Sequence, residues 1–149
     1  MPVSDVVVRL EIRGEPIAQP RPRVVTIAGR ARAISAPRKH PVTDWKKRIM
    51  VALAQQFDGE ILDGPIHLDV LFLMPRPKRL YRKKDPPGEV WHTSRPDADN
   101  LIKAVKDAMN SIVWKDDSQV CELVVTNKYH GKSGHPAAVV EVRCLTDCP

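Results

Sequence analysis

Alternating apolar and polar positions mark the strands of this chain. The segment "DVVVRLEIRG" alternates and is rich in β-branched residues, which predicts a strand that ends at Gly14. In "GPIHLDVLFLMP" the apolar residues that share one strand face are Ile66, Leu68, Val70, Phe72 and Met74. Two later segments, "SQVCELVVTNKYHG" and "AAVVEVRCL", predict a closing antiparallel pair joined by "GKSGHP".

Helical periodicity predicts two helices. In "PVTDWKKRIMVALAQQF" an apolar stripe recurs at helical spacing, and Thr43 or Asp44 is expected to cap the start; the stripe is Trp45, Ile49, Ala52 or Leu53, and Phe57. A second helix is expected to begin at Pro96 and Asp97, with Asp97 as a natural cap. Its sheet-facing side is predicted to hold Leu101, Ile102, Val105, Ala108, Met109 and Ile112.

The order of elements predicts an α+β fold. Strand, helix, strand, helix, strand, strand fits one domain over residues 1–149, with a mixed β-sheet flanked by two helices. Two Pro-rich basic loops interrupt this order, at about 14–40 and 75–96. The first loop contains "VVTIAGRARAIS", which could form a small hairpin turning at Ala28–Gly29.

Charge and cysteine content limit the classes of partner, location and metal site that the chain can have. A net charge of +6 favours a polyanionic partner, either nucleic acid or an acidic membrane. No apolar run approaches the roughly 20 residues of a membrane span, and the N-terminus does not resemble a signal peptide, so a cytoplasmic location is expected. The cysteines lack the paired spacing of a zinc site and are expected to be reduced thiols: Cys121, Cys144 and Cys148.

Carboxylates gather in "RPDADNLIKAVKDAMNSIVWKDDSQ", residues 95–119 of an otherwise basic chain. A purely structural interpretation makes Asp97 a cap and joins Asp99, Lys103 and Asp107 in an i, i+4 ladder. It does not explain the adjacent pair Asp116 and Asp117. Oxygen ligands from separate elements suit a hard divalent cation such as Mg²⁺.

This stretch closely resembles the signature of the RusA family of Holliday junction resolvases. The likeness includes D-x-D-N, a Lys four residues after the second Asp, and W-x-D-D-x-Q. The segment "GEPIAQPRPRV" is also similar to the opening of phage and prophage relatives. Met109 stands where Leu is usual in the family.

The resemblance implies a small Mg²⁺-dependent endonuclease, with Mn²⁺ as a substitute, in a bacterial or phage-infected cell. Such enzymes act as homodimers that cut four-way DNA junctions symmetrically, in recombination and repair. By position, Asp97, Asp99 and Asp117 become the metal-binding carboxylates, and Lys103 an essential basic residue beside them. The roles of Asp107 and Asp116, as ligands or as supporting groups, stay open.

The basic loops are expected to contact DNA phosphates. The residues concerned are Arg21, Arg23, Arg30, Arg32, Arg38, Lys39, Arg76, Lys78, Arg79, Arg82, Lys83, Lys84 and Arg95. Tyr81 and Trp91 could stack on exposed bases, although packing is the favoured role for Trp91. Two alternatives remain: a non-catalytic DNA-binding module with structural carboxylates, and a transferase that uses D-x-D to hold a nucleotide diphosphate. The chain lacks the Gly-rich phosphate loop that would support the transferase.

Overall fold

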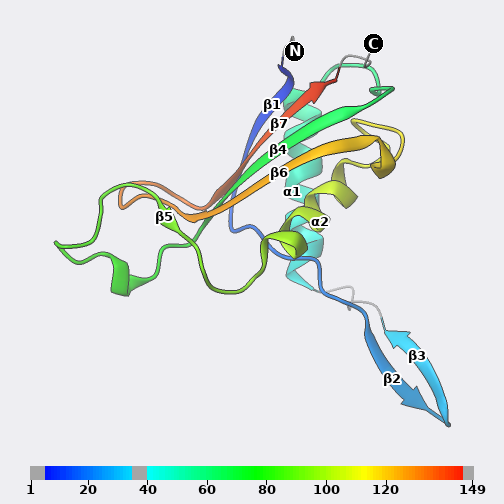
Figure 1. Ribbon diagram of the computed structural model, residues 1–149, viewed down its shortest axis with the longest axis horizontal. Helices are drawn as coiled ribbons and strands as arrows, with labels where there is room; N and C mark the ends of the chain where they lie inside the picture. The colour runs from blue at the N-terminus through cyan, green and yellow to red at the C-terminus, as the bar shows by residue number, and fades with distance from the viewer. Residues whose placement is uncertain (1–5, 35–39, 146–149) are drawn as a thin grey trace.

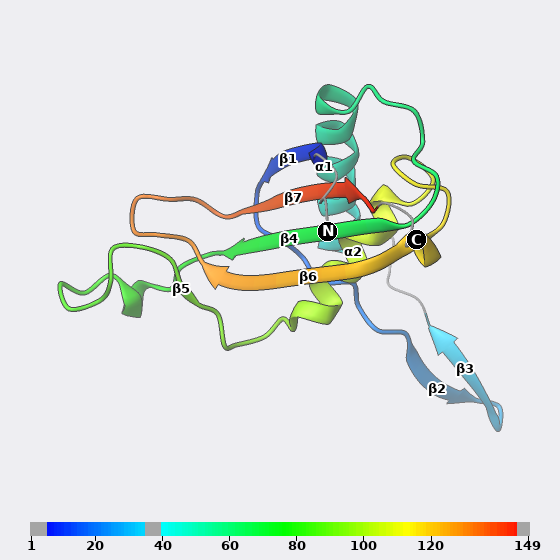
Figure 2. The same cartoon turned by 45° about the horizontal axis from the view of Figure 1, so that its top comes forward.

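Five strands form one mixed sheet, with β4 at its centre (Figures 1 and 2). The computed structural model describes residues 6–34 and 40–145. The order across the sheet is β1-β7-β4-β6-β5, and β4 and β6 are parallel while the other neighbours are antiparallel. The strands are β1 (Val6–Arg13), β4 (Ile66–Met74), β5 (Val90–Trp91), β6 (Val120–Tyr129) and β7 (Ala137–Cys144).

Two helices, α1 (Pro41–Gln56) and α2 (Ala98–Met109), pack on the same face of the sheet. Every second residue of β4 is fully or almost fully buried beneath them, as its alternating sequence predicts. The stripe of α1 and the apolar side of α2 complete a single core, which confirms the predicted α+β class. Neither helix in the described ranges is long and apolar enough to cross a membrane.

Both helix starts differ from the expected capping. The cap of α1 is His40, whose Nδ1 accepts a hydrogen bond from the backbone N–H of Val42 at 3.1 Å. The prediction of Thr43 or Asp44 is therefore wrong, because the helix begins earlier, with Pro41 in its first turn. Asp97 occupies the N-cap of α2, but its side chain makes no capping hydrogen bond. Its carboxylate is consequently not used to hold the helix.

The predicted pairing of the last two strands is wrong. Strand β4 lies between β6 and β7, and Leu68 is in register with Leu123 on one side and Val142 on the other. The connection from β6 to β7 passes the end of β4, where the N–H of His130 donates to the carbonyl of Met74 at 3.1 Å. Placing β4 centrally buries its fully apolar face, which an edge position would leave partly open.

A separate hairpin projects from the body of the molecule (Figures 1 and 2). Strands β2 (Arg23–Ile27) and β3 (Arg30–Ile34) pair only with each other. The turn residues Ala28 and Gly29 have φ of 51° and 74°, as a two-residue type I′ turn requires, so the predicted turn is confirmed. Three of the residues considered in the sequence lie outside the described ranges: Arg38, Lys39 and Cys148.

Candidate active site

Asp97 and Asp99 lie together in the first turn of α2, and both are exposed. Arg21 reaches Asp99 from the segment before the hairpin: its Nη2 lies 3.4 Å from Asp99 Oδ2, and its Nε donates to Asn100 Oδ1 at 3.4 Å. A cleft of about 460 Å³ opens beside Asp97. Its lining is Ala18, Gln19, Pro20, Arg21, His40, Arg95, Pro96, Asp97 and Asn100.

Gln19 brings a further oxygen to this cleft. Its backbone N–H donates to the carbonyl of Asn100 at 3.0 Å, which holds the segment before the hairpin against α2. Its side-chain Oε1 is buried and has no hydrogen-bond partner among the described residues. A buried acceptor without a partner is costly, so a donor or a cation at this position would stabilise it. The cleft is therefore lined by three oxygen-bearing side chains, those of Asp97, Gln19 and Asn100. Asp99 lies beside it, in contact with the lining residue Arg21.

Asp117 is not part of this group. It begins the short helix η2 (Asp117–Gln119), directly before β6, whereas the N-terminus of α2 lies near the other end of β6, where Asn127 Nδ2 donates to the carbonyl of Pro96 at 3.4 Å. The 12 residues of α2 span about 18 Å. Within the described ranges, no three Asp, Glu, His or Cys side chains are grouped so that they could hold a metal ion. One chain thus keeps the expected ligands at opposite ends of α2.

Hydrogen bonds fix the side chains of Asp116 and Asp117, beyond the C-terminal end of α2. Trp114, a buried residue, donates its indole N–H to Asp117 Oδ1 at 2.9 Å. Asp116 caps η2 by accepting from the N–H of Ser118 at 3.0 Å and from the Ser118 hydroxyl. The hydroxyl contact is the main reason that the pKa of Asp116 lies below its usual value. Asp116 therefore has a clear structural role in the turn.

Lys103 lies one helical turn after Asp99 and is exposed. The expected ladder through Lys103 is absent from the ion pairs of the described residues, because Asp99 pairs with Arg21 and Asp107 pairs with Lys46 of α1 at 3.7 Å. Asp107 thus ties α2 to α1. Lys103 makes no ion pair with another described residue, and it lies on the helix that begins at the carboxylate pair.

A hydrogen-bond network ties the chain entering Asp97 to β6. The N–H of His92 donates to the carbonyl of Asn127 at 3.2 Å, and Asn127 Nδ2 lies 2.9 Å from His92 Nδ1. The same Nδ2 faces the carbonyl of Pro96, which can only accept. Nδ1 of His92 must therefore accept, so the ring is neutral with its hydrogen on Nε2. Burial lowers the pKa of His92, which favours the same neutral form.

Tyr129 supports the same segment. Its ring meets that of His92 edge to face, with centroids 4.7 Å apart, and its hydroxyl donates to Ser94 Oγ at 3.4 Å. Residues 92–96 are thereby held at several points before α2 begins. Nothing in the spacing pointed to Asn127, which is 35 positions away from His92.

Comparison with known proteins identifies the family of this chain. The family model described as "Endodeoxyribonuclease RusA" matches residues 13–143. The chain belongs to the RusA family. It is 33% identical to the uncharacterized protein YqaN of Bacillus subtilis (strain 168), over 91% of this chain and 95% of that protein. It is 26% identical to the crossover junction endodeoxyribonuclease RusA of Aquifex aeolicus (strain VF5), over 68% of each chain. Membership of the RusA family supports a nuclease activity on DNA junctions.

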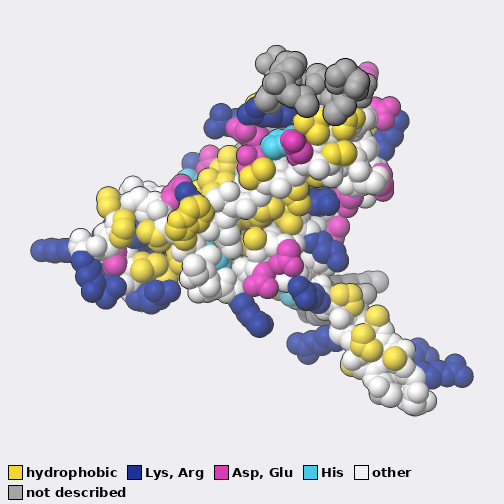
Figure 3. Space-filling model, viewed as in Figure 1, with side chains coloured by type: hydrophobic (Ala, Val, Ile, Leu, Met, Phe, Trp, Pro, Cys, Tyr) yellow, Lys and Arg dark blue, Asp and Glu magenta, His cyan; other side chains and the backbone are white. Residues whose placement is uncertain are grey.

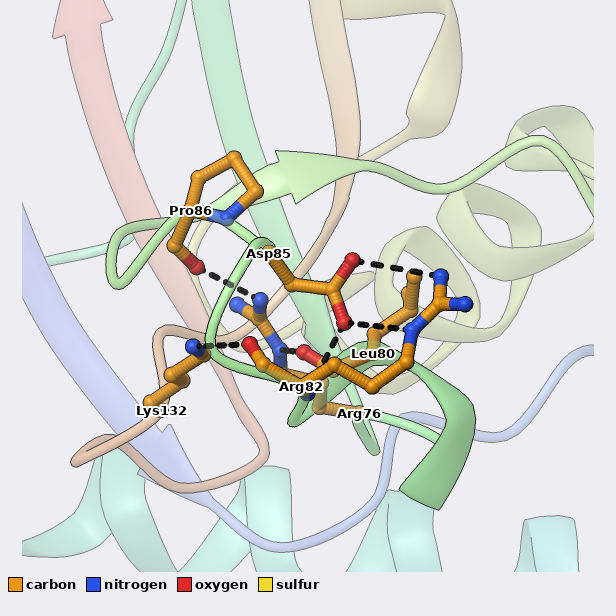
Figure 4. Close-up of polar contacts among 6 residues, drawn as sticks. All are labelled: Arg76, Leu80, Arg82, Asp85, Pro86 and Lys132. Carbon is orange, nitrogen blue, oxygen red and sulfur yellow. Dashed lines mark hydrogen bonds and ion pairs between the residues drawn. The ribbon is translucent and has the colours of Figure 1, made fainter.

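The second basic loop of this RusA-family chain is built around a buried arginine (Figure 4). Arg76 is only 6% exposed. Its guanidinium donates to four backbone carbonyls, at 2.6 to 3.3 Å: those of Leu80, Pro86, Gly88 and His130. The expectation that Arg76 contacts a phosphate is replaced by a structural role, because its donors already hold the loop closed.

Arg82 is also engaged within the loop (Figure 4). Its Nε lies 3.2 Å from Asp85 Oδ2, and this contact is the main reason that the pKa of Asp85 lies below its usual value. Lys132 Nζ donates to the carbonyl of Arg82 at 2.7 Å, which joins the loop to the β6–β7 connection. The basic side chains of the loop that are exposed and make no ion pair with a described residue are Lys78, Arg79, Lys83, Lys84 and Arg95.

The two candidate stacking residues are both exposed. Trp91 on β5 is 68% exposed, and Lys128 Nζ lies 4.6 Å from its ring centroid. The favoured packing role for Trp91 is therefore wrong: β5 pairs with only two residues at the edge of β6, which leaves the indole on the surface. Tyr81 is 45% exposed and covers the guanidinium of Arg76 at 5.6 Å. Both rings lie on the surface of the second basic loop or next to it.

Basic side chains gather at the projecting parts of the molecule, while an acidic patch lies over the start of α2 between them (Figure 3). One projection is the β2–β3 hairpin, with exposed Arg23, Arg30 and Arg32. The other is the loop braced by Arg76. The charge distribution thus places an anionic centre between two cationic arms.

Proposed function

We propose that the protein is a homodimeric, divalent-metal-dependent endonuclease that resolves four-way DNA junctions by paired symmetric cuts. The observation that carries the proposal is the exposed carboxylate pair Asp97 and Asp99, between two cationic arms. Asp97 lines a cleft together with Arg21 and Arg95, and Asp99 contacts Arg21. Carboxylates repel phosphates, so an acidic centre on a DNA-binding surface is explained best by a cation between the two.

The oxygen chemistry of the cleft fits Mg²⁺, or Mn²⁺ in its place. Mg²⁺ in nuclease-type sites is commonly held by one or two carboxylates together with substrate phosphates and water, rather than by a closed protein cage. Asp97 and Asp99 supply such carboxylates, and Gln19 adds a buried amide oxygen without a partner among the described residues. When bound, the ion would lower the pKa of the attacking water and neutralise charge that develops on the phosphate.

The other side chains of the cleft would position the DNA strand. Arg21 and Arg95 line the same cleft as Asp97 and can bind phosphates on either side of the scissile bond. Lys103 stands one turn along α2, on the helix that carries the carboxylates, and can donate to the oxygens of the scissile phosphate as their charge grows. Hydrogen bonds of Asn127 with His92 and with the carbonyl of Pro96 hold the segment that leads into Asp97.

The position of Asp117 favours a second copy of the chain. Asp117 lies beyond the far end of α2, about a helix length from Asp97, so it cannot share an ion with Asp97 in one chain without a large rearrangement. In a two-fold dimer, Asp117 of one protomer can approach the carboxylate pair of its partner, and the symmetry repeats the site twice. Two sites related in this way suit two strands of like polarity in a junction.

The test is incubation of the purified protein with a labelled four-way junction and, separately, with a linear duplex. We expect paired cuts in the junction with Mg²⁺ or Mn²⁺, none with EDTA, and little cleavage of the duplex. Tight junction binding without cleavage under either ion would contradict the proposal and indicate a non-catalytic DNA-binding module instead.

A further inference from the structure

The β2–β3 hairpin has two chemically different faces. Residues paired across the hairpin point to the same side, and the printed register separates them cleanly. One face carries three arginines, each paired across the hairpin with an aliphatic residue: Arg23 with Ile34, Arg32 with Val25, and Arg30 with Ile27. The other face has no charge and consists of Val24, Thr26, Ala31 and Ala33. The hairpin therefore has one face that combines cationic and aliphatic side chains and one face that is uncharged.

Neither face packs against the body of the protein as far as residues 6–34 and 40–145 describe it. Nine of the ten strand residues are exposed, among them Ile27 and Ile34 at about half of their full area. A lone two-stranded hairpin is marginal in water, and exposed branched aliphatic residues are costly there. A partner that covers the face with the arginines would offset both costs.

The base of the hairpin is fixed at the candidate active site. Arg21, two residues before β2, contacts Asp99 and Asn100, and Gln19 is bonded through its backbone to Asn100. The arm therefore leaves the molecule from the first turn of α2, next to the carboxylates. A molecule that occupies the cleft is also within reach of the arm.

We propose that the hairpin is a groove-binding arm, which lies in the major groove of a duplex arm next to the cleavage point with its arginine face toward the bases. The proposal rests on the proposed function, which supplies DNA as the occupant of the cleft. A two-stranded ribbon fits the major groove, which is about 12 Å wide, but not an undeformed minor groove of about 6 Å.

The composition of this face suits the floor of that groove. Arg guanidinium groups match the O6 and N7 acceptors of guanine, and aliphatic side chains match thymine methyl groups. Arginines that only neutralise phosphates would need no interleaved aliphatic residues. The pairing of each arginine with an aliphatic residue across the hairpin, such as Arg30 with Ile27, thus favours contact with base edges as well as phosphates.

The first test compares equivalent changes on the two faces, with junction binding measured in EDTA so that cleavage plays no part. Ile27→Thr with Ile34→Thr should weaken binding about ten-fold while leaving its salt dependence unchanged, because no charge is lost. Threonine keeps the β propensity of the strands. Val24→Thr, the matched control on the uncharged face, should bind as the wild type does. Equal effects on the two faces, or no effect on either, would overturn the proposal.

The second test asks which groove is occupied. Methylation of guanine N7 near the branch point should interfere with binding by the wild type, and this interference should be lost in the variant Arg23→Gln, Arg30→Gln, Arg32→Gln. Interference only from adenine N3, in the minor groove, would overturn the assignment.

The mass of the Ile27→Thr, Ile34→Thr variant is measured by sedimentation, and it should equal that of the wild type. A fall in mass would instead place this face against a second protein copy and overturn the proposal. A wild type that binds no DNA at all would contradict the proposed function itself, which separates the two failures.

Discussion

Asn127 on β6 holds His92 and Pro96 with a single amide group, at 2.9 Å from His92 Nδ1 and 3.4 Å from the Pro96 carbonyl. Asn127→Ala removes both contacts and leaves partly buried acceptors unpaired, which should lower the free energy of unfolding by about 1–3 kcal/mol. The cleavage rate should fall more than the affinity for the junction, because the Asn127 amide positions Asp97 and belongs to neither of the two cationic arms that would bind DNA. Thermal unfolding, cleavage rate and gel-shift affinity provide the check, with Thr126→Ala on the opposite face of β6 as the control.

The neutral ring of His92 makes stability depend on pH. Its pKa in the folded protein lies below the ordinary value of about 6.5. The unfolded chain therefore binds the proton more readily, so stability should be complete above about pH 6.5 and should decline as the pH falls below it. Comparing the unfolding temperature of the wild type and of His92→Gln from pH 7.5 to 5 isolates this contribution. Parallel curves for the two proteins would show that His92 is not the source of the pH dependence.

Removing either carboxylate of the cleft should abolish cutting without loss of binding. In Asp97→Asn and Asp99→Asn the shape is kept and the affinity for a cation is lowered, so junction cleavage should collapse. Junction affinity should hold or rise, because one repulsion toward phosphate is gone. Lys103→Ala should also stop cleavage, with a modest loss of affinity. Cleavage rates, gel shifts and circular dichroism are the measurements.

Asp107→Asn is the matched control for these changes. Asp107 pairs with Lys46 at the surface, so its loss should cost only a few tenths of a kcal/mol in stability and leave most of the activity. Folded Asp97→Asn and Asp99→Asn proteins that cut as fast as Asp107→Asn would show that the metal site is elsewhere.

Mixing two inactive variants tests whether Asp117 acts on its partner's site. If Asp97 and Asp117 come from different protomers, a dimer of Asp97→Asn with Asp117→Asn contains one intact site and one doubly damaged site. After random exchange, about a quarter of the wild-type sites should be active, and their product should be a single nick. If both residues act within one protomer, every site in the mixed dimer carries one substitution and no activity returns.

Arg76→Met should damage the basic loop rather than weaken one phosphate contact. Four carbonyls lose their shared donor, so we expect a loss of about 2–4 kcal/mol in unfolding free energy or local opening of residues 76–90. Hydrogen exchange of the loop and chemical denaturation measure it. Lys83→Ala, in contrast, should leave stability unchanged and reduce the salt slope of junction binding by about one unit.

Local patterns predicted the elements of the fold well, because the alternation of β4 and the apolar side of α2 reflect burial directly. The turn at Ala28–Gly29 was also predictable from turn chemistry. The central place of β4 was not, since it depends on which distant strands pair. Two adjacent strands in sequence commonly form a hairpin, and here the energy of burying β4 on both edges outweighs that tendency.

The arrangement of the candidate site could be predicted from the sequence only in part. Asp97 and Asp99 do lie together, because two positions in one helical turn cannot separate. The distance to Asp117 depends on the direction of α2 relative to β6, which no local pattern encodes. Arg76 shows a similar limit: its charge is visible in the sequence, while the carbonyls that surround it belong to residues up to 54 positions away.

The bond from Trp114 to Asp117 gives the protein an internal optical reporter. An indole whose N–H is bound to a carboxylate changes its emission when that carboxylate is neutralised or engaged elsewhere. Of the three tryptophans, Trp45 and Trp114 are buried and Trp91 is exposed, so Trp91→Phe removes the solvent-quenched background. The fluorescence that remains comes from Trp45 and Trp114. The proposed dimer and cation site predict that the Trp114 contribution changes on protomer association or on addition of Mg²⁺, without any label on protein or DNA.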